Sequence, residues 1–210
     1  MKLWSDAFKD GAMIPPQYAF CDKDAASHVR LSDNRNPPLA WSDVPNGTES
    51  LVLMVFDNDA PQDRADVNQD GRIVAVQAPR GTFYHWTLVD IAPGQRAIEE
   101  GAFSDGVTAR GKSPRSGDGA QASARQGLND YTGWFEGDSA MEGDYYGYDG
   151  PCPPWNDQLI HNYIFRLYAL DVPQLDLPAR FTGDDVKKAL FGHILDEAQL
   201  IASYTLNPVL

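Results

Sequence analysis

Two histidines, a carboxylate and a tyrosine are the side chains whose types and placement could support chemistry. His85 and His161 stand at or near the start of strongly apolar stretches, where a histidine needs a polar partner. Alternate residues of an extended strand share a face, so we expect His161 and Tyr163 to project to the same side. Asp57 ends the apolar run that begins at Leu51, where its carboxylate could accept an imidazole N–H. Together these groups could line one small polar pocket.

The same side chains also allow a plainer interpretation, in which each histidine is a satisfied core residue and Asp57 only caps a turn. The stretch from Tyr148 to Trp155, just before His161, favours the cavity instead. Its prolines, glycine and aromatic rings are typical of a rigid wall with few backbone donors, which suits the rim of a small pocket.

Two classes of enzyme would use some of the same residues. Asp57, His85 and His161 could hold iron or zinc with open coordination positions, which makes a metal-dependent enzyme the second hypothesis. The facial triad that usually does this contains a His-x-Asp pair, and none occurs in the sequence. Hydrolysis through a nucleophile is disfavoured because there is no G-x-S-x-G motif and Cys152 lies between two prolines. We therefore expect a binding protein with no catalytic residue, no metal and no other cofactor.

A literal match to the phosphate-binding P-loop pattern lies at Gly106 to Ser113, which reads G-V-T-A-R-G-K-S. That motif needs a buried strand before it and a helix after it, so that backbone N–H groups meet at the phosphates. Pro114 follows at once, and the preceding residues are polar, so we reject the match.

Half of a calcium-binding loop also occurs, as D-x-N-x-D-G. Its residues are Asp66, Asn68, Asp70 and Gly71. The twelfth position, which would supply the closing bidentate carboxylate, is Gln77, and no helical pattern flanks the segment. A tight polar turn is favoured over a calcium site.

The elements that must position these residues are mostly strands. Apolar runs rich in aromatic and β-branched residues predict strands at Leu51–Asp57, Phe83–Ile91, Ile160–Asp171 and Leu200–Leu206. A capping-box pattern at Thr182 and Asp185 predicts a short helix that ends before Gly192. Two long polar insertions, at about 61–81 and 101–150, interrupt a single domain that spans residues 1–210.

The composition limits the partners and the compartment. Lys and Arg number 17 against 30 for Asp and Glu, a formal net charge of -13, which argues against nucleic acid and against docking on an anionic membrane. No run approaches the roughly 20 apolar residues of a membrane span, and no apolar leader is seen, so we expect a cytoplasmic protein without integral membrane association. Cys21 and Cys152 are expected to be free thiols.

Several different short motifs occur one after another along nearly the whole chain. They are Ser5-Asp6-Ala7-Phe8, Gly11 and Ile14-Pro15; Asn36 through Trp41; Pro45 through Thr48; Asp57 through Pro61; His85-Trp86; Gly150 through Pro154; and His161 through Asp171. At these spacings the sequence resembles the phosphatidylethanolamine-binding proteins, also called Raf-kinase-inhibitor-like proteins, in their bacterial branch.

This resemblance implies a mainly β fold, an antiparallel sandwich-like arrangement of a large sheet packed with a smaller one, with one or two short helices near the C-terminus. It also implies the residues of the pocket. Asp57 matches the family's D-P-D-x-P motif, His85 matches its H-W pair, and His161 and Tyr163 match its G-x-H-R-Y motif, while Pro151 would lie in the wall.

The implied ligand is a small anion or a phospholipid head group, such as phosphate, phosphorylethanolamine or a carboxylate. Regulation of a kinase or protease through an unknown protein partner is a further alternative, and a homodimer is possible by the same resemblance. The sequence departs from the family pattern at Asn58, which replaces a proline, and at Asn162, which replaces an arginine. Because a charged histidine would strengthen anion capture, we expect affinity to fall as pH rises through neutrality.

Overall fold

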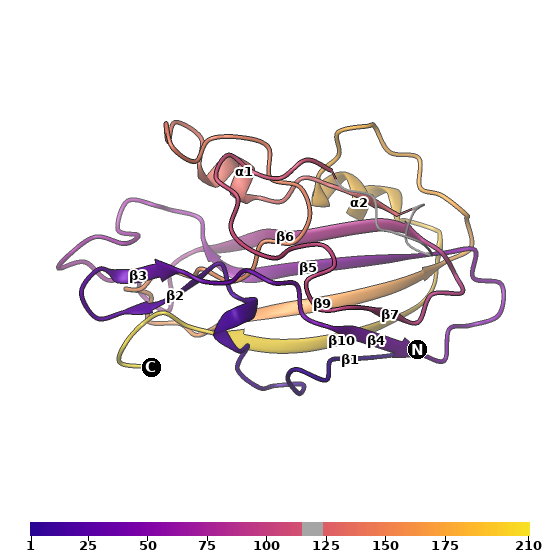
Figure 1. Cartoon of the computed structure of the whole chain (residues 1–210), viewed down its shortest axis with the longest axis horizontal. Helices are drawn as coiled ribbons and strands as arrows, with labels where there is room; N and C mark the ends of the chain where they lie inside the picture. The colour runs from indigo at the N-terminus through magenta and orange to yellow at the C-terminus, as the bar shows by residue number, and fades with distance from the viewer. Residues whose placement is uncertain (115–123) are drawn as a thin grey trace.

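A computed structural model describes residues 1–114 and 124–210. Within them, the largest sheet has five antiparallel strands in the order β10, β9, β5, β6, β8, with three-stranded and two-stranded sheets beside it (Figure 1). The strands of the large sheet are β5 (Ser50–Pro61), β6 (Arg80–Ile91), β8 (Arg125–Gln126), β9 (His161–Leu170) and β10 (Ile194–Tyr204). The smaller sheets are β1 (Lys2–Trp4), β4 (Leu39–Ser42) and β7 (Ala97–Ile98), and the hairpin of β2 (Cys21–Asp24) and β3 (His28–Leu31).

These sheets confirm the mainly β, antiparallel fold expected from the sequence. The four predicted strands correspond to β5, β6, β9 and β10, although most boundaries differ, including the start of β6, which lies at Arg80 rather than at Phe83. β5 continues past Asp57 to Pro61, and β10 begins at Ile194 rather than at Leu200. The first half of β10 is largely exposed, so it lacks the apolar run that would have predicted it.

The hydrophobic core lies on both faces of the large sheet. Leu51, Leu53 and Val55 of β5 pack with residues of β1, β4 and β7 on one face. Val52 and Met54 point to the other face, where they pack with the helix α2. A strand buried on both faces reads as a continuous apolar run, which explains why β5 shows no alternation in the sequence.

The C-terminal helix follows its sequence signals. α2 (Gly183–Ala189) starts at Thr182, whose side chain accepts the N–H of Asp185 in a capping box, as predicted. A 3₁₀ turn at Pro16–Tyr18 and the four-residue helix α1 (Tyr131–Trp134) were not predicted, and α1 lies within the second polar insertion. No helix in the described residues has the length and apolar character needed to cross a membrane.

The half calcium motif forms a tight polar turn that is anchored to a distant segment. The side-chain amide of Asn156 donates to the carbonyl of Asp66 and accepts the N–H of Asn68. The side-chain oxygen of Asn68 accepts the N–H of Trp155 rather than pointing into a shared centre. Residues 99–114 contain no strand or helix, so no strand leads directly into the P-loop match at Gly106 to Ser113, in agreement with its rejection, and most of the segment that follows it lies outside the described residues.

Cys21 and Cys152 form a disulfide, so the expectation of two free thiols is wrong. The bond joins the start of β2 to the proline-rich stretch across a sequence separation of 131 residues. No spacing motif in the sequence pairs the two cysteines, and the fold alone brings their Cα atoms to 4.9 Å. Because disulfides persist mainly in oxidising compartments, this bond weighs against the cytoplasmic location, which stays an untested prediction.

Replacing Cys21 and Cys152 together by serine should lower the free energy of unfolding by roughly 2–5 kcal/mol, because a cross-link over so long a span restricts the unfolded chain. Urea denaturation of the variant and the wild type measures this difference. Wild-type protein kept in a reducing agent is the matched control and should approach the variant. Equal midpoints for oxidised wild type and variant would contradict a stabilising role for the bond.

Candidate ligand-binding site

Three neighbouring strands of the large sheet carry the predicted side chains. Asp57 of β5 lies opposite Tyr163 of β9 on one side and Phe83 of β6 on the other. His161 begins β9, two residues before Tyr163, so strand alternation places both on one face. His85 lies in β6 close to a shift in its register with β5, a type of irregularity that often re-aims side chains at functional sites. The structure thereby brings Asp57, His85, His161 and Tyr163 to the lining of one cavity.

His161 is held on both sides by carboxylates. Its Nδ1 lies 2.6 Å from Oδ2 of Asp57, and its Nε2 lies 3.0 Å from Oδ2 of Asp157. An ionised carboxylate can only accept, so both ring nitrogens donate and the ring is an imidazolium. Arg80 donates to both oxygens of the same Asp157 carboxylate, with Nη2 3.0 Å from Oδ1. Two carboxylates and two cations form a buried group with no net charge.

The protonation of this group follows from its contacts. Burial disfavours the charged ring, but the hydrogen bonds and charges of Asp157 and Asp57 outweigh burial and raise the pKa of His161 to about 9. Burial also disfavours the charged form of Asp157 and so raises its pKa. The hydrogen bonds from His161 and Arg80 outweigh this and hold the pKa of Asp157 below its ordinary value. Since both N–H groups of His161 are engaged by carboxylates, this histidine has none left to donate to a ligand.

His85 has the opposite character. Its Nδ1 lies 2.8 Å from the carbonyl oxygen of Asp149, which can only accept, so Nδ1 carries a proton. Burial lowers the pKa of His85 to about 4, and the nearby charge of Asp57 opposes this shift only in part. At neutral pH the ring is therefore uncharged, and with the proton on Nδ1 its Nε2 is an acceptor.

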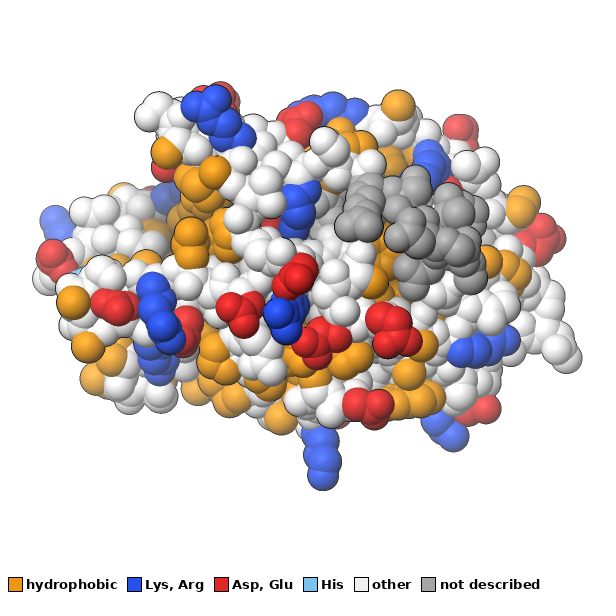
Figure 2. All heavy atoms as spheres, in the orientation of Figure 1, with side chains coloured by type: hydrophobic (Ala, Val, Ile, Leu, Met, Phe, Trp, Pro, Cys, Tyr) orange, Lys and Arg blue, Asp and Glu red, His pale blue; other side chains and the backbone are white. Residues whose placement is uncertain are grey.

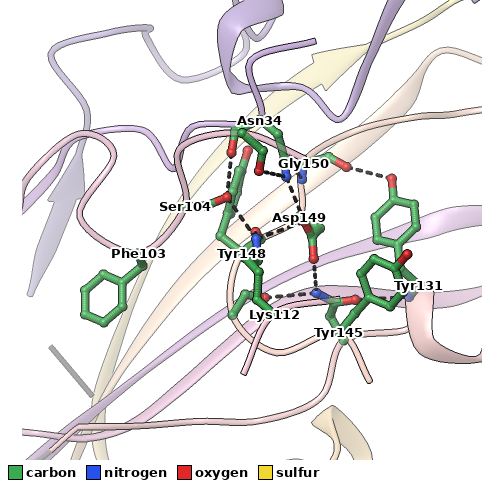
Figure 3. A network of polar contacts seen from close by, with 12 residues as sticks. Asn34, Phe103, Ser104, Lys112, Tyr131, Tyr145, Tyr148, Asp149 and Gly150 are labelled. Atoms are coloured by element: carbon green, nitrogen blue, oxygen red, sulfur yellow. Dashed lines mark hydrogen bonds and ion pairs between the residues drawn. The ribbon is translucent and has the colours of Figure 1, made fainter. Parts of the chain in front are cut away.

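A buried polar network behind the cavity fixes Asp149 (Figure 3). Its carboxylate accepts from the amides of Asn34 and Asn129 at 2.7 and 2.8 Å, and from the ammonium of Lys112 at 2.9 Å. The backbone N–H of Asp149 also donates to the carbonyl of His85. Lys112, the lysine of the rejected P-loop match, thus serves to hold the residue that sets the tautomer of His85.

The cavity has a volume of about 280 Å³ and lies beside the disulfide. Its walls are mostly aromatic and come from several segments. They include Phe20, Leu31, Phe83, Tyr131, Trp134, Phe135, Met141, Pro153 and Pro154, together with the disulfide between Cys21 and Cys152. In Figure 2, hydrophobic side chains are exposed on the surface between the α1 segment and the β2–β3 hairpin. We call the ionic group of Asp57, His161, Asp157 and Arg80 the floor of the cavity. Charged side chains at the floor under apolar walls suit a small ligand with one polar end.

Pro151 and Tyr163 occupy different positions relative to this cavity. Pro151 does not line it, and its carbonyl accepts the N–H groups of Phe20 and Cys21 at 2.9 and 3.2 Å, so it supports the wall from behind. Tyr163 does line it, and its hydroxyl makes no hydrogen bond to another described residue. Burial and the charge of Asp57 raise the pKa of Tyr163, so the phenol remains a donor at every physiological pH.

Several site residues were missed from the sequence. Asp157 and Arg80, which complete the charge group, lie just outside predicted strands, and no local pattern marks them as buried. The aromatic wall had a detectable signal, because Tyr131, Trp134 and Phe135 follow a helical i, i+3, i+4 spacing inside an otherwise polar insertion.

The metal hypothesis finds no support in this geometry. In residues 1–114 and 124–210, no group of three or more His, Cys, Asp or Glu side chains is arranged to hold a metal ion. His161 has both nitrogens in hydrogen bonds to carboxylates, and His85 donates its Nδ1 proton to a backbone carbonyl.

Residues 4–205 match the family model described as phosphatidylethanolamine-binding protein. The chain belongs to this family. A UPF0098 protein of Methanothermobacter thermautotrophicus is 34% identical over 97% of this chain and 98% of the relative, and one of Aquifex aeolicus is 31% identical over 97% and 88%. The family resemblance stated from the sequence is therefore confirmed, with relatives in both archaea and bacteria.

Two solved structures support the same assignment. A putative phosphatidylethanolamine-binding protein homologue from Chlamydia trachomatis has a TM-score of 0.63 and 30% identity, with 97% of this chain and 95% of that chain covered. E. coli YbcL, described as a new member of the mammalian family, has a TM-score of 0.67 and 25% identity over 97% of each chain.

The stability of this family member should decrease as pH rises from 6.5 to about 9. The folded state keeps His161 protonated through this window while the unfolded chain loses the proton near 6.5, so the contribution of His161 is complete below 6.5 and disappears at about 9. The full effect is on the order of 3 kcal/mol. Urea denaturation at the two pH values measures it.

Two variants make this test specific. His161→Gln should be less stable and should show a weaker pH dependence than the wild type over that window. His193→Gln, which removes an exposed histidine paired with Asp171, should keep the wild-type dependence. The same slope in His161→Gln and wild type would show that another group titrates.

Proposed function

We propose that this protein binds a small oxyanion, such as phosphate, phosphorylethanolamine or a carboxylate, in the cavity lined by Asp57, His85, His161 and Tyr163. The hydroxyl of Tyr163 carries the proposal, because it lines the cavity and has no hydrogen-bond partner among the described residues. Among the described residues, this oxygen is not one of the fully buried polar atoms that lack a partner, so it faces the open cavity, where an oxyanion can accept its proton in place of water. Membership of the phosphatidylethanolamine-binding family supports the same ligand chemistry.

His85 provides the second polar contact. Its uncharged ring offers Nε2 as an acceptor, which suits the O–H of a monoanionic phosphate or of a hydroxyl-bearing ligand. Alternatively the ring takes up a proton when an anion arrives and then donates. In either case one proton lies between His85 and the ligand, and the network around Asp149 keeps Nδ1 turned away from it.

The charged floor has a positioning role in this proposal. Asp57 and Asp157 neutralise His161 and Arg80, so the floor attracts neither anions nor cations strongly. The histidine that can take up a proton when an anion binds is therefore His85 rather than His161. Such a site binds without an activated nucleophile, and regulation of a kinase or protease and assembly into a homodimer remain expectations from the sequence.

Tyr163→Phe should weaken binding of phosphorylethanolamine about tenfold or more, because a hydrogen bond to a charged acceptor contributes roughly 1.5–3 kcal/mol. Isothermal titration calorimetry measures both proteins, with inorganic phosphate as a second probe that separates the oxyanion from the head group. Tyr18→Phe is the matched control, since that buried hydroxyl donates to Glu100 and does not line the cavity. If wild-type protein binds neither probe, the proposed function is wrong.

Affinity for an anion should fall as pH rises from about 5.5 to 8.5. Free His85 has a pKa of about 4, and a bound anion raises it, so the complex holds more protons than the free protein and is favoured at low pH. Calorimetry in two buffers of different ionisation enthalpy counts the protons taken up. Inorganic sulfate, whose charge is constant over this range, is the control probe, and a flat profile without proton uptake would contradict a role for His85.

A further inference from the structure

One charged side chain that lines the cavity, Arg64, has no opposite charge paired with it there. Apart from tyrosines, whose phenols stay neutral, the acidic and basic side chains that line the cavity are Asp57, Arg64, His85 and His161. Asp57 and His161 belong to the neutral floor group, and His85 is uncharged at neutral pH. Arg64 makes no direct ion pair with any residue the structure describes, and its charge acts only at longer range on the carboxylate of Asp130. The positive charge available to an anion therefore comes from Arg64.

Arg64 is also held in place for such a role. Its guanidinium carbon lies 4.4 Å from the centre of the Trp134 ring, so the planar group rests on an aromatic surface. A guanidinium held over an aromatic ring still has N–H groups that can meet two oxygens of a carboxylate or a phosphate. Stacking also limits the rotamers of the side chain, which lowers the entropy lost on binding.

The two partners of this contact come from separate polar insertions. Arg64 lies in the loop between β5 and β6, and Trp134 ends α1 in the second insertion. Both residues line the cavity together with Phe135 and Met141 of the same insertion. The first insertion thus adds a cation to the cavity, and the second supplies the ring on which it rests. The cations of the floor are already paired with carboxylates.

We propose that Arg64 is the residue that selects negative charge in this cavity, by binding the carboxylate or phosphate oxygens of the ligand. This inference rests on the proposed function and deepens it. In this proposal the oxyanion accepts from both the guanidinium of Arg64 and the hydroxyl of Tyr163, and the remaining atoms of the ligand lie against the aromatic walls. The cavity accepts anions and rejects neutral analogues of the same shape.

The test measures phosphorylethanolamine binding by calorimetry at low and high sodium chloride. Arg64→Gln should weaken binding about tenfold at low salt and should lose most of the salt dependence seen in wild type, because the screened charge has been removed. Arg64→Lys should keep the salt dependence with a smaller loss of affinity, since it retains the charge without the paired N–H geometry. The salt dependence is a readout that a merely structural role would not change.

Arg72→Gln is the matched control, because Arg72 lies in the same loop, pairs weakly with Asp66 at 3.8 Å and does not line the cavity. It should bind as wild type does. Equal affinity and equal salt dependence in Arg64→Gln and wild type, with binding still lost in Tyr163→Phe, would overturn the role of Arg64 and leave the proposed function standing. Absence of binding by wild type would overturn both.

Discussion

A charged imidazole buried between two carboxylates is the constraint around which the site is organised. His161 contacts Asp57 and Asp157, and Arg80 adds the second cation that makes the group neutral. A buried charge without its partner is strongly destabilising, so each member requires the others. The need to satisfy this group joins β5, the start of β6, the start of β9 and the segment before β9 at one place.

The floor and the walls of the cavity have different physical origins. The floor stands on long strands whose register is set by apolar packing on both faces of the sheet. The walls come from the insertions, the proline-rich stretch and the β2–β3 hairpin, and the disulfide ties the last two of these together. The polar groups of the floor are therefore held rigidly by the sheet, while the walls are formed largely by loops. Changes in the insertions can then alter ligand preference without disturbing the sheet.

Two histidines of the same type have contrasting states because their neighbours differ. Carboxylates on both sides keep His161 charged, while the desolvation that comes with burial keeps His85 neutral. The environment therefore assigns a structural charge to one ring and a proton-accepting role to the other. Sequence reasoning treated them as equivalent, because the partners that separate them, Asp157 and Asp149, lie in segments without a clear pattern.

The sequence by itself determined the four long strands of the large sheet, the capped C-terminal helix and the family, because apolar runs, capping residues and ordered motifs are local signals. Strand periodicity also placed His161 and Tyr163 on one face, and the end of an apolar run placed Asp57 near them. Only the tertiary structure decided the pairing of Cys21 with Cys152, the position of Pro151 behind the wall, and the charge contributed by Arg64. These features join residues far apart in the chain, and contacts between distant segments depend on how the insertions fold over the sheet.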